Sequence, residues 1–247
     1  MAVKNRPGFQ TNVDRTVRGT SRKTLFYDIK PGTTALLRFT PTSNEDGQLF
    51  FESSQHFKFL EDGEKRAWAC LDMHGNGEQQ CPICDALERA EEVLGKAIAK
   101  NLISEHGASQ RWHAQVIPIR PEGTEAADQS YIVGLSKTTA GKVSSILKLE
   151  RDTRQPFLTD PEKGQAVQIE RNSATGFNTR YEVLASGLRV PLDTLLPAWE
   201  EKFLDVEKSL KLRIEDKETL MLSMKETFGD VAFLALFPAD IESLPNA

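Results

Sequence analysis

The residues most suited to chemistry are the three cysteines of the chain, Cys70, Cys81 and Cys84, which lie close together in the sequence. Two histidines accompany them, His56 upstream and His74 between the first two cysteines. Thiolate and imidazole are ligands that Zn²⁺ prefers, and three cysteines with one histidine complete a tetrahedral structural site with no open position. The spacing therefore predicts one structural zinc ion, held by the three cysteines and one of these histidines.

Two other types of cysteine site fit the sequence less well. Cys81-Pro-Ile-Cys84 has the spacing of a dithiol redox motif, but such motifs normally begin a helix after a strand, without a third thiol nearby. A zinc deaminase needs a proline directly before the first cysteine of the pair and a glutamate two residues after the histidine. Here Pro82 follows Cys81, and neither His56 nor His74 has that glutamate. A structural site remains the prediction.

The choice between the two histidines depends on the strands that position them. Residues 49–60 are predicted to form a strand, because aromatic residues recur on one face with the two-residue period, which leaves His56 on the other face. A turn at 61–64 would return the chain along 66–71 toward Cys70. This hairpin favours His56. His74 is the alternative, and would need the loop between Cys70 and Cys81 to fold back tightly.

The other elements predict a mainly β fold with inserted helices (α+β). Further strands are expected at 34–40, 111–120, 130–135, 165–171 and 179–185. Helices are expected at 85–105 and 137–149, with a helical pattern from 192 to about 228. This order is compatible with a small barrel that carries the metal module between its strands. Three parts are predicted: a flexible basic arm (1–23), a core (24–190) with a zinc insert at about 55–107, and a C-terminal helical segment with a mildly acidic tail (191–247).

Basic and aromatic residues on the predicted strands and the neighbouring helix form a second group. Single-stranded nucleic acid is typically bound by a cationic groove whose aromatic rings stack on the bases. Aromatic residues in strands are, however, usually core residues, and surface cations are usually only solvated. Phe177 is the best individual candidate, because it follows Gly176 in a polar turn. The candidate DNA-binding residues are Arg111, Trp112, Arg120, Tyr131, Lys137, Lys142, Arg171, Phe177, Arg180 and Tyr181.

Charge and composition narrow the function further. The net charge is −5, yet residues 1–23 carry six basic residues against one acidic residue. A basic arm on an acidic chain favours contact with an anionic polymer or an acidic partner, although a solvated, disordered terminus has the same composition. No apolar run is long enough to span a membrane and no secretory signal is present, so a cytoplasmic protein without membrane contact is expected. No catalytic motif was found, and a non-enzymatic protein is expected.

These motifs together resemble the T-even phage single-stranded DNA-binding (helix-destabilising) protein family. The resemblance extends over most of residues 20–190. Its motifs follow in the order of that family: 34–42, Gln55-His56-Phe-Lys58, Trp68-Ala-Cys70, His74-Gly75, Cys81-Pro-Ile-Cys84, Arg111-Trp112 and the hairpin from Ser173 to Tyr181.

The resemblance implies a five-stranded OB-fold barrel with a zinc-bearing insert beside a positively charged cleft. It implies His56 rather than His74 as the fourth ligand. It also implies a phage protein that coats single-stranded DNA in the host cell during replication, recombination or repair. The basic arm would serve self-association. Recruitment of replication or recombination proteins through the C-terminus stays open, because the C-terminus could instead be the end of an ordered helix that packs on the barrel. The sequence departs from the family pattern in having no aromatic residue at 77–80, no tyrosine at 86–105 and no long acidic tail.

Other functional classes stay open on sequence grounds. An RNA-binding, translation-regulating OB protein would prefer RNA over DNA of equal sequence. A zinc-bearing adaptor between proteins would not bind oligothymidylate at low salt. An enzyme, such as a nuclease or a redox protein, would show turnover that disappears when a cysteine or an acidic residue is replaced.

Overall fold

The structure, a computed structural model, describes residues 25–41, 48–59, 65–75, 80–119, 127–174, 179–212, 214–216, 218–221, 225 and 236. These residues form two compact units. The cysteine unit contains the described residues from 53 to 110 and from 212 onward. The sheet unit contains the described residues up to 52 and from 111 to 211. The predicted arm and most of the predicted tail lie outside the described residues, and the predicted domain boundaries stay predictions.

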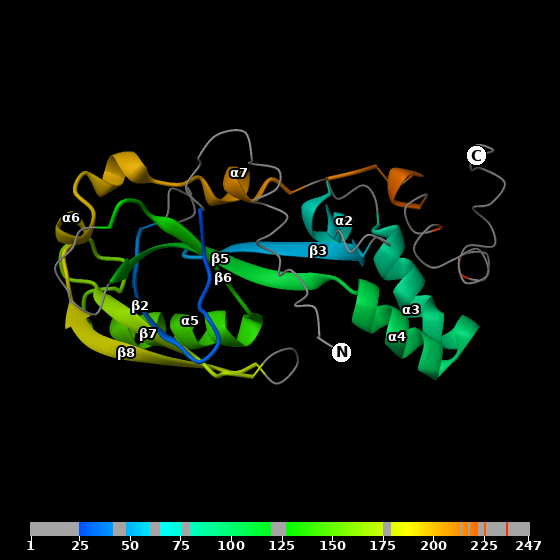
Figure 1. Cartoon of the computed structure of the whole chain (residues 1–247), viewed down its shortest axis with the longest axis horizontal. Coiled ribbons are helices and arrows are strands. Elements are labelled where there is room, and N and C mark those ends of the chain that lie inside the picture. Colours follow the sequence, from blue (N-terminus) through cyan, green and yellow to red (C-terminus); the bar gives the residue numbers. More distant parts are fainter. Residues whose placement is uncertain are drawn as a thin grey trace, which may run out of the picture. The chain divides into compact units, whose positions relative to one another are not determined.

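Strands dominate the fold, as predicted (Figure 1). In the sheet unit the strand order is β1-β6-β5-β2-β7-β8, and β3 and β4 form an antiparallel hairpin. Along this order β1 and β8 are the two ends, so the described pairing is an open path, and a closed five-stranded barrel is not confirmed. The strands are β1 (Phe26–Tyr27), β2 (Thr34–Phe39), β3 (Phe51–Phe59), β4 (Lys65–Ala69), β5 (Ser109–Ile119), β6 (Tyr131–Leu135), β7 (Gln165–Arg171) and β8 (Tyr181–Arg189).

Strand β2 is the centre of the sheet unit. It pairs antiparallel with both β5 and β7. Leu37 and Phe39 are fully buried in one hydrophobic cluster, whereas Leu36 packs against a second cluster. Successive side chains of a strand point to opposite faces, so both faces of β2 are covered. This explains the nearly continuous apolar composition of the strand.

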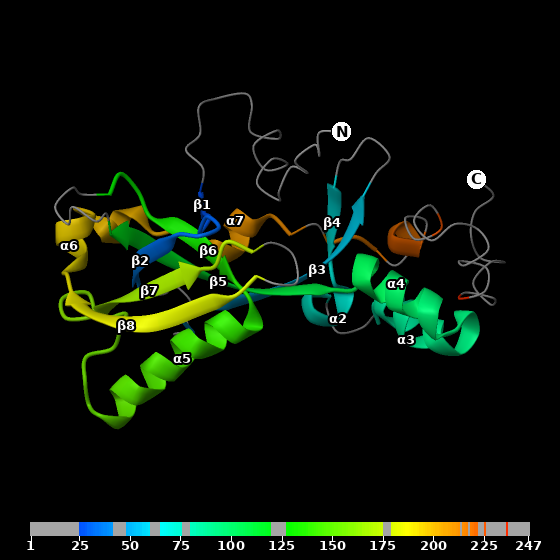
Figure 2. The ribbon, with the colours of Figure 1, turned by 60° about the horizontal axis from the view of Figure 1, so that its bottom comes forward.

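Helix α5 (Lys137–Asp152) packs against the sheet and confirms the helix predicted at 137–149. Ser136 caps its N-terminus by accepting a hydrogen bond from the backbone N–H of Thr139. Ala140 and Val143 are buried in the sheet cluster. Figure 2 shows α5 running along β8, with its other side turned away from the sheet.

The cysteine unit contains α2 (Leu71–His74), α3 (Pro82–Leu94) and α4 (Lys96–His106), and α3 and α4 contact each other (Figure 1). The prediction of a single helix at 85–105 was therefore wrong. Gly95 separates the two helices with φ 81° and ψ 158°, a conformation that glycine alone adopts readily. Helical periodicity continues on both sides of this residue, which is why the sequence pattern did not reveal the break.

The segment after β8 also differs from the long helical pattern expected. Its described residues form the short elements α6 (Leu192–Leu195), the 3-10 helix η2 (Trp199–Lys202) and α7 (Val206–Leu210), and residues 218–221 are helical again. Pro197 cannot continue a helix, and Ala198 takes the left-handed conformation directly before η2. Leu192, Leu196 and Trp199 are nevertheless buried with Ile117 of β5, so this segment contributes to the core of the sheet unit. Among the described helices, none is long and apolar enough to cross a membrane.

Candidate metal centre and nucleic-acid interface

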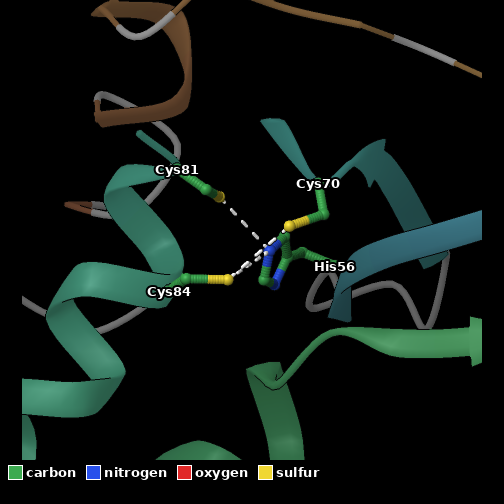
Figure 3. Close-up of side chains that lie close together, drawn as sticks. All are labelled: His56, Cys70, Cys81 and Cys84. Carbon is green, nitrogen blue, oxygen red and sulfur yellow. Dashed lines mark hydrogen bonds between the residues drawn. The ribbon is translucent and has the colours of Figure 1, made fainter. Parts of the chain in front are cut away.

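Four predicted metal ligands meet in the cysteine unit (Figure 3). His56 comes from β3, Cys70 follows β4, and Cys81 and Cys84 lie at the start of α3. Their ligand atoms all lie within 4.8 Å of one another. His56, Cys70 and Cys81 are buried, and Cys84 is half-buried. The group can therefore hold one metal ion.

The distances between these atoms fit a small tetrahedral ion. The Nε2 atom of His56 lies 3.4 Å from the Sγ atom of Cys81 and 3.6 Å from that of Cys84. The sulfurs of Cys70 and Cys84 lie 3.6 Å apart. Metal–sulfur bonds of about 2.3 Å and metal–nitrogen bonds of about 2.0 Å, arranged tetrahedrally, require separations of about 3.8 Å between sulfurs and about 3.5 Å between sulfur and nitrogen. These three separations are close to those values, and all four ligand atoms lie within 4.8 Å of one another.

Local structure explains how the four side chains converge. His56 lies opposite Trp68 in the β3–β4 hairpin, as the hairpin pattern predicted, and the backbone N–H of Cys70 donates to the carbonyl of Ser54 at 2.9 Å. Pro82 starts α3, where its missing N–H costs nothing, so both sulfurs of the Cys-x-x-Cys pair belong to the first turn of this helix. The unpaired N–H groups and the dipole at a helix N-terminus favour thiolates.

The two histidines have different roles. The Nδ1 atom of His56 lies 2.9 Å from the backbone carbonyl of His106, to which it donates, and this directs Nε2 to the sulfurs. The Nε2 atom of His74 instead accepts the backbone N–H of Ser54 at 2.9 Å. His74 thus supports the β3 backbone, and among the described residues the cluster consists of His56 and the three cysteines.

The electrostatics of the cluster favour a bound cation. Burial lowers the pKa of His56, but hydrogen bonds with Cys70 and Cys81 outweigh it and raise this pKa to about 10. Hydrogen bonds from Cys70 and Cys84 lower the pKa of Cys81, whereas hydrogen bonds with Cys70 and Cys81 raise the pKa of Cys84. Without a cation, one thiolate therefore opposes the ionisation of its neighbour. A divalent ion would allow all three thiols to ionise together.

A second group of predicted residues meets in the sheet unit. Arg171 and Tyr181 face each other across β7 and β8, with the guanidinium carbon 6.0 Å from the ring centroid. Arg171 also donates through Nη1 to the carbonyl of Ile29 at 2.8 Å, which fixes its position. The Nζ atom of Lys142 donates to the carbonyl of Tyr181 at 2.7 Å and ties α5 to β8. Arg171 and Lys142 thus both contact Tyr181, whose ring is half-buried.

Tyr131 joins this group through β1, which the sequence did not reveal. The rings of Tyr131 and Tyr27 pack edge to face, with centroids 6.0 Å apart. Tyr27 is followed by Asp28, whose carboxylate lies 3.6 Å from the Nη1 atom of Arg171. The half-buried rings of Tyr27 and Tyr131 are therefore linked to Arg171 through Asp28, the neighbour of Tyr27 in the chain. The only sequence signal for Tyr27 was the aromatic pair Phe26-Tyr27 before the first predicted strand.

The other candidates belong to several elements or lie outside the described residues. Trp112 is half-buried, packs against the sheet cluster and lies opposite Leu135 in the β5–β6 register. Arg111, Lys137 and Arg180 are exposed, on β5, at the start of α5 and directly before β8, respectively. The structure does not describe Arg120 and Phe177.

The protein has one unit built on a β-sheet and a second unit that contains the Cys3His cluster. It therefore belongs to the class of β proteins with a module that can bind a metal. Comparison with protein-family models matches residues 32–232 to the family described as gp32 DNA binding protein like. This match covers most of the chain, so the protein belongs to that family, and the resemblance found in the sequence is confirmed. A search of curated proteins found no match to the chain.

Proposed function

We propose that this protein binds single-stranded DNA without base specificity and has no enzymatic activity. The family match over residues 32–232 carries the proposal. The group of tyrosines and cations around Arg171 supports it, because cations can neutralise phosphates while aromatic faces stack on bases. The DNA-contacting residues proposed are Arg111, Trp112, Arg120, Tyr131, Lys137, Lys142, Arg171, Phe177, Arg180 and Tyr181.

The metal proposed is one structural Zn²⁺ ion bound by His56, Cys70, Cys81 and Cys84. Three thiolates and an imidazole suit zinc better than the hard cations, which prefer oxygen ligands. The four ligands fill a tetrahedral coordination shell, so the ion has no open position for a substrate. Its role is to hold β3, β4 and α3 together. Cys70 and Cys81 are also members of the hydrophobic cluster of that unit, which links metal binding to packing.

Other parts of the proposal rest on the family alone. We propose that the sheet is of the OB type, with the cysteine unit as its insert, and that the protein coats DNA in phage replication, recombination or repair in the host cytoplasm. Self-association through the basic arm and recruitment of replication or recombination proteins through the C-terminus complete the proposal.

Tryptophan fluorescence tests the proposed function. Trp68 and Trp199 are buried, at 4% and 7% exposure, whereas Trp112 is half-buried. Oligothymidylate should quench the wild-type emission, and the logarithm of affinity should fall with the logarithm of salt concentration by about 0.7 for each phosphate contacted. Trp112→Phe should remove most of the quenching, and the matched control Trp199→Phe should retain it. Failure of the wild type to bind at low salt would contradict the proposal.

Competition distinguishes DNA from RNA as the ligand. DNA and RNA oligomers of equal sequence would compete for the protein, with the DNA oligomer expected to bind more tightly. A preference for RNA would favour the translation-regulating alternative. Catalytic turnover of either oligomer would contradict the non-enzymatic assignment.

A further inference from the structure

Phe157 is an exposed aromatic residue in the loop between α5 and β7. Its side chain is 47% exposed, and among the aromatic side chains that the structure describes no other is as exposed. A phenylalanine ring has no polar atom to gain from water, and an exposed ring is available to stack on a base. The side chain of the next residue, Leu158, is fully buried, so Phe157 points to solvent while Leu158 points into the core.

The loop that carries Phe157 is held by two buried charged side chains. The carboxylate of Glu150 accepts the backbone N–H of Leu158 at 2.7 Å and the side-chain amide of Gln165 at 2.6 Å. The guanidinium of Arg38 donates to the carbonyls of Leu158 and Asp160. Arg38 and Glu150 are 0% and 3% exposed. Burying a charged side chain is costly unless it is fully hydrogen-bonded. The hydrogen bonds of these two buried side chains therefore fix the position of the loop.

Several exposed cations lie on α5 and just after it, close to Phe157 along the chain. Lys148 and Arg151 are exposed on α5, and Arg154 is exposed just after the helix. Lys148 and Arg151 lie eleven and fourteen residues after Lys137, about three and four helical turns, so these three residues share one side of the helix. Lys142 is also exposed on α5.

The acidic residues nearby offset only part of this charge. Glu150 is buried, and Asp152 forms an ion pair with Arg151 at 3.4 Å. The Oδ1 atom of Asp160 accepts the backbone N–H groups of Glu162 and Lys163. The exposed charges of α5 itself are four cations against Asp152 alone, on a chain whose net charge is −5.

We infer that Phe157, together with Lys148, Arg151 and Arg154, forms a second stacking subsite for single-stranded nucleic acid at the C-terminal end of α5. This inference rests on the proposed function. The eight residues from Lys142, which binds Tyr181, to Glu150, which binds Leu158, rise about 12 Å along the axis of α5, so the subsite lies beyond the group around Tyr181 along this helix. The buried carboxylate of Glu150 and the guanidinium of Arg38 preorganise the ring, so little loop entropy is lost on binding.

Oligonucleotide length separates this subsite from the group around Tyr181. Oligothymidylates of about 4 and about 16 nucleotides bracket the site sizes of OB folds. Phe157→Ala should weaken binding of the long oligomer about tenfold and leave the short one unchanged. Ile103→Ala, which truncates a side chain of 50% exposure on α4, is the matched control and should change neither. Thermal unfolding of each variant confirms that it is folded.

The salt dependence tests the cations. Lys148→Ala and Arg154→Ala should each reduce the salt slope for the long oligomer by about 0.7 and leave the slope for the short one unaltered. Lys100→Ala on α4 removes an equal charge from the cysteine unit and should alter neither slope. Phe157→Trp provides a direct probe of the subsite. The emission that this variant adds to that of the wild-type tryptophans should be quenched by the long oligomer and not by the short one.

The outcomes that overturn the subsite are distinct. Equal affinities of the wild type and Phe157→Ala for the long oligomer, or equal losses for both oligomers, would refute it. A change in sedimentation of DNA-free Phe157→Ala, with unchanged DNA affinity, would assign the ring to a protein contact instead. A wild type that binds neither oligomer would overturn the proposed function and the subsite with it.

Discussion

At the scale of single residues, His56 acts through both of its ring nitrogens. Its Nδ1–H group is fixed by the carbonyl of His106, so Nε2 faces the sulfurs of Cys81 and Cys84. His74 uses its Nε2 atom on the backbone N–H of Ser54. The two histidines therefore form a natural pair for testing which one binds the metal.

His56→Ala should lose the metal, whereas His74→Ala should retain it. The first change removes a ligand. The second removes the hydrogen bond to Ser54, and the loss of such a bond costs about 1 kcal/mol of the free energy of unfolding. Metal content of the purified variants, measured by elemental analysis, checks both. Metal loss in His74→Ala with retention in His56→Ala would reverse the assignment.

His113 gives the sheet unit a dependence on pH. It is 7% exposed, and burial, with a smaller effect of Arg111, lowers its pKa from 6.5 to about 4. Its pKa is lower in the folded than in the unfolded chain, so folding favours the neutral ring. This stability is complete above pH 6.5 and is lost as the pH falls toward 4, by about 3 kcal/mol.

Urea unfolding at pH 7 and pH 4 measures this loss. His113→Leu cannot take up the proton, so it should lose about 3 kcal/mol less than the wild type over this interval. Acid also releases metal from cysteines, but it does so in both proteins, and the difference between them isolates His113. Equal losses in the two proteins would exclude this role.

The sequence predicted the metal cluster but not the buried charges. Cys70, Cys81 and Cys84 are close in sequence, and a hairpin brings His56 beside them, so local rules were sufficient. Arg38 looked like any other residue of a β-strand. Besides the carbonyl of Phe39, its acceptors are the carbonyls of Leu158, Asp160 and Val190, which are far along the chain and cannot be predicted from a local pattern.

At the scale of elements, the loop between α5 and β7 depends on a close approach of Gly164 to Arg38. A Cβ atom on Gly164 would lie 2.5 Å from Nη2 of Arg38 and 2.6 Å from the carbonyl oxygen of Leu158. Burial lowers the pKa of Arg38 to about 10, opposed by Asp160 and Glu150, so the guanidinium stays charged at neutral pH and cannot be displaced cheaply.

Gly164→Ala should therefore destabilise the protein by about 1–3 kcal/mol, as overpacking does. Gly141 in α5 is the matched control, because a Cβ atom there meets nothing within 4 Å. Gly141→Ala should stabilise the protein by up to about 1 kcal/mol through helix propensity. Urea unfolding of both variants at pH 7 provides the comparison, and equal effects would contradict the close packing described.

Element boundaries were predictable where side-chain periodicity changes and not where only the backbone changes. The strands at 34–40, 165–171 and 179–185 were recognised because apolar and β-branched residues mark them. The break at Gly95 depends on one φ angle, and the short elements after Leu192 depend on Pro197 and left-handed residues such as Ala198. Hydrophobic patterns are insensitive to both.

At the scale of the whole molecule, the order of the strands in the sheet could not be predicted from the sequence. β2 pairs with β5 and β7, both distant along the chain, and these long-range pairings depend on the fit of side chains rather than on local preference. The two units also have separate hydrophobic clusters. Trp68, Cys70 and Cys81 belong to one, whereas Leu37 and Val167 belong to another. This division makes a prediction about metal removal.

Chelation should unfold the cysteine unit and spare the sheet unit. The cysteine unit is small, and two of the proposed ligands are part of its core, so loss of the metal removes packing as well as bonds. Hydrogen exchange measured by mass spectrometry should show faster exchange in peptides from 65–75 and 81–106 after chelation. Peptides from 165–171 and 181–189 should keep their protection, since their hydrogen bonds and core contain no ligand.

Two variants make this test specific. Cys81→Ser should reproduce the exchange pattern of the chelated wild type without any chelator. Gly164→Ala should do the opposite, with faster exchange in the sheet unit and full metal content, because its clash with Arg38 lies among residues of that unit. If chelation exposed both units equally, the two clusters would form one cooperative core. The metal would then stabilise the whole fold rather than the module that holds it.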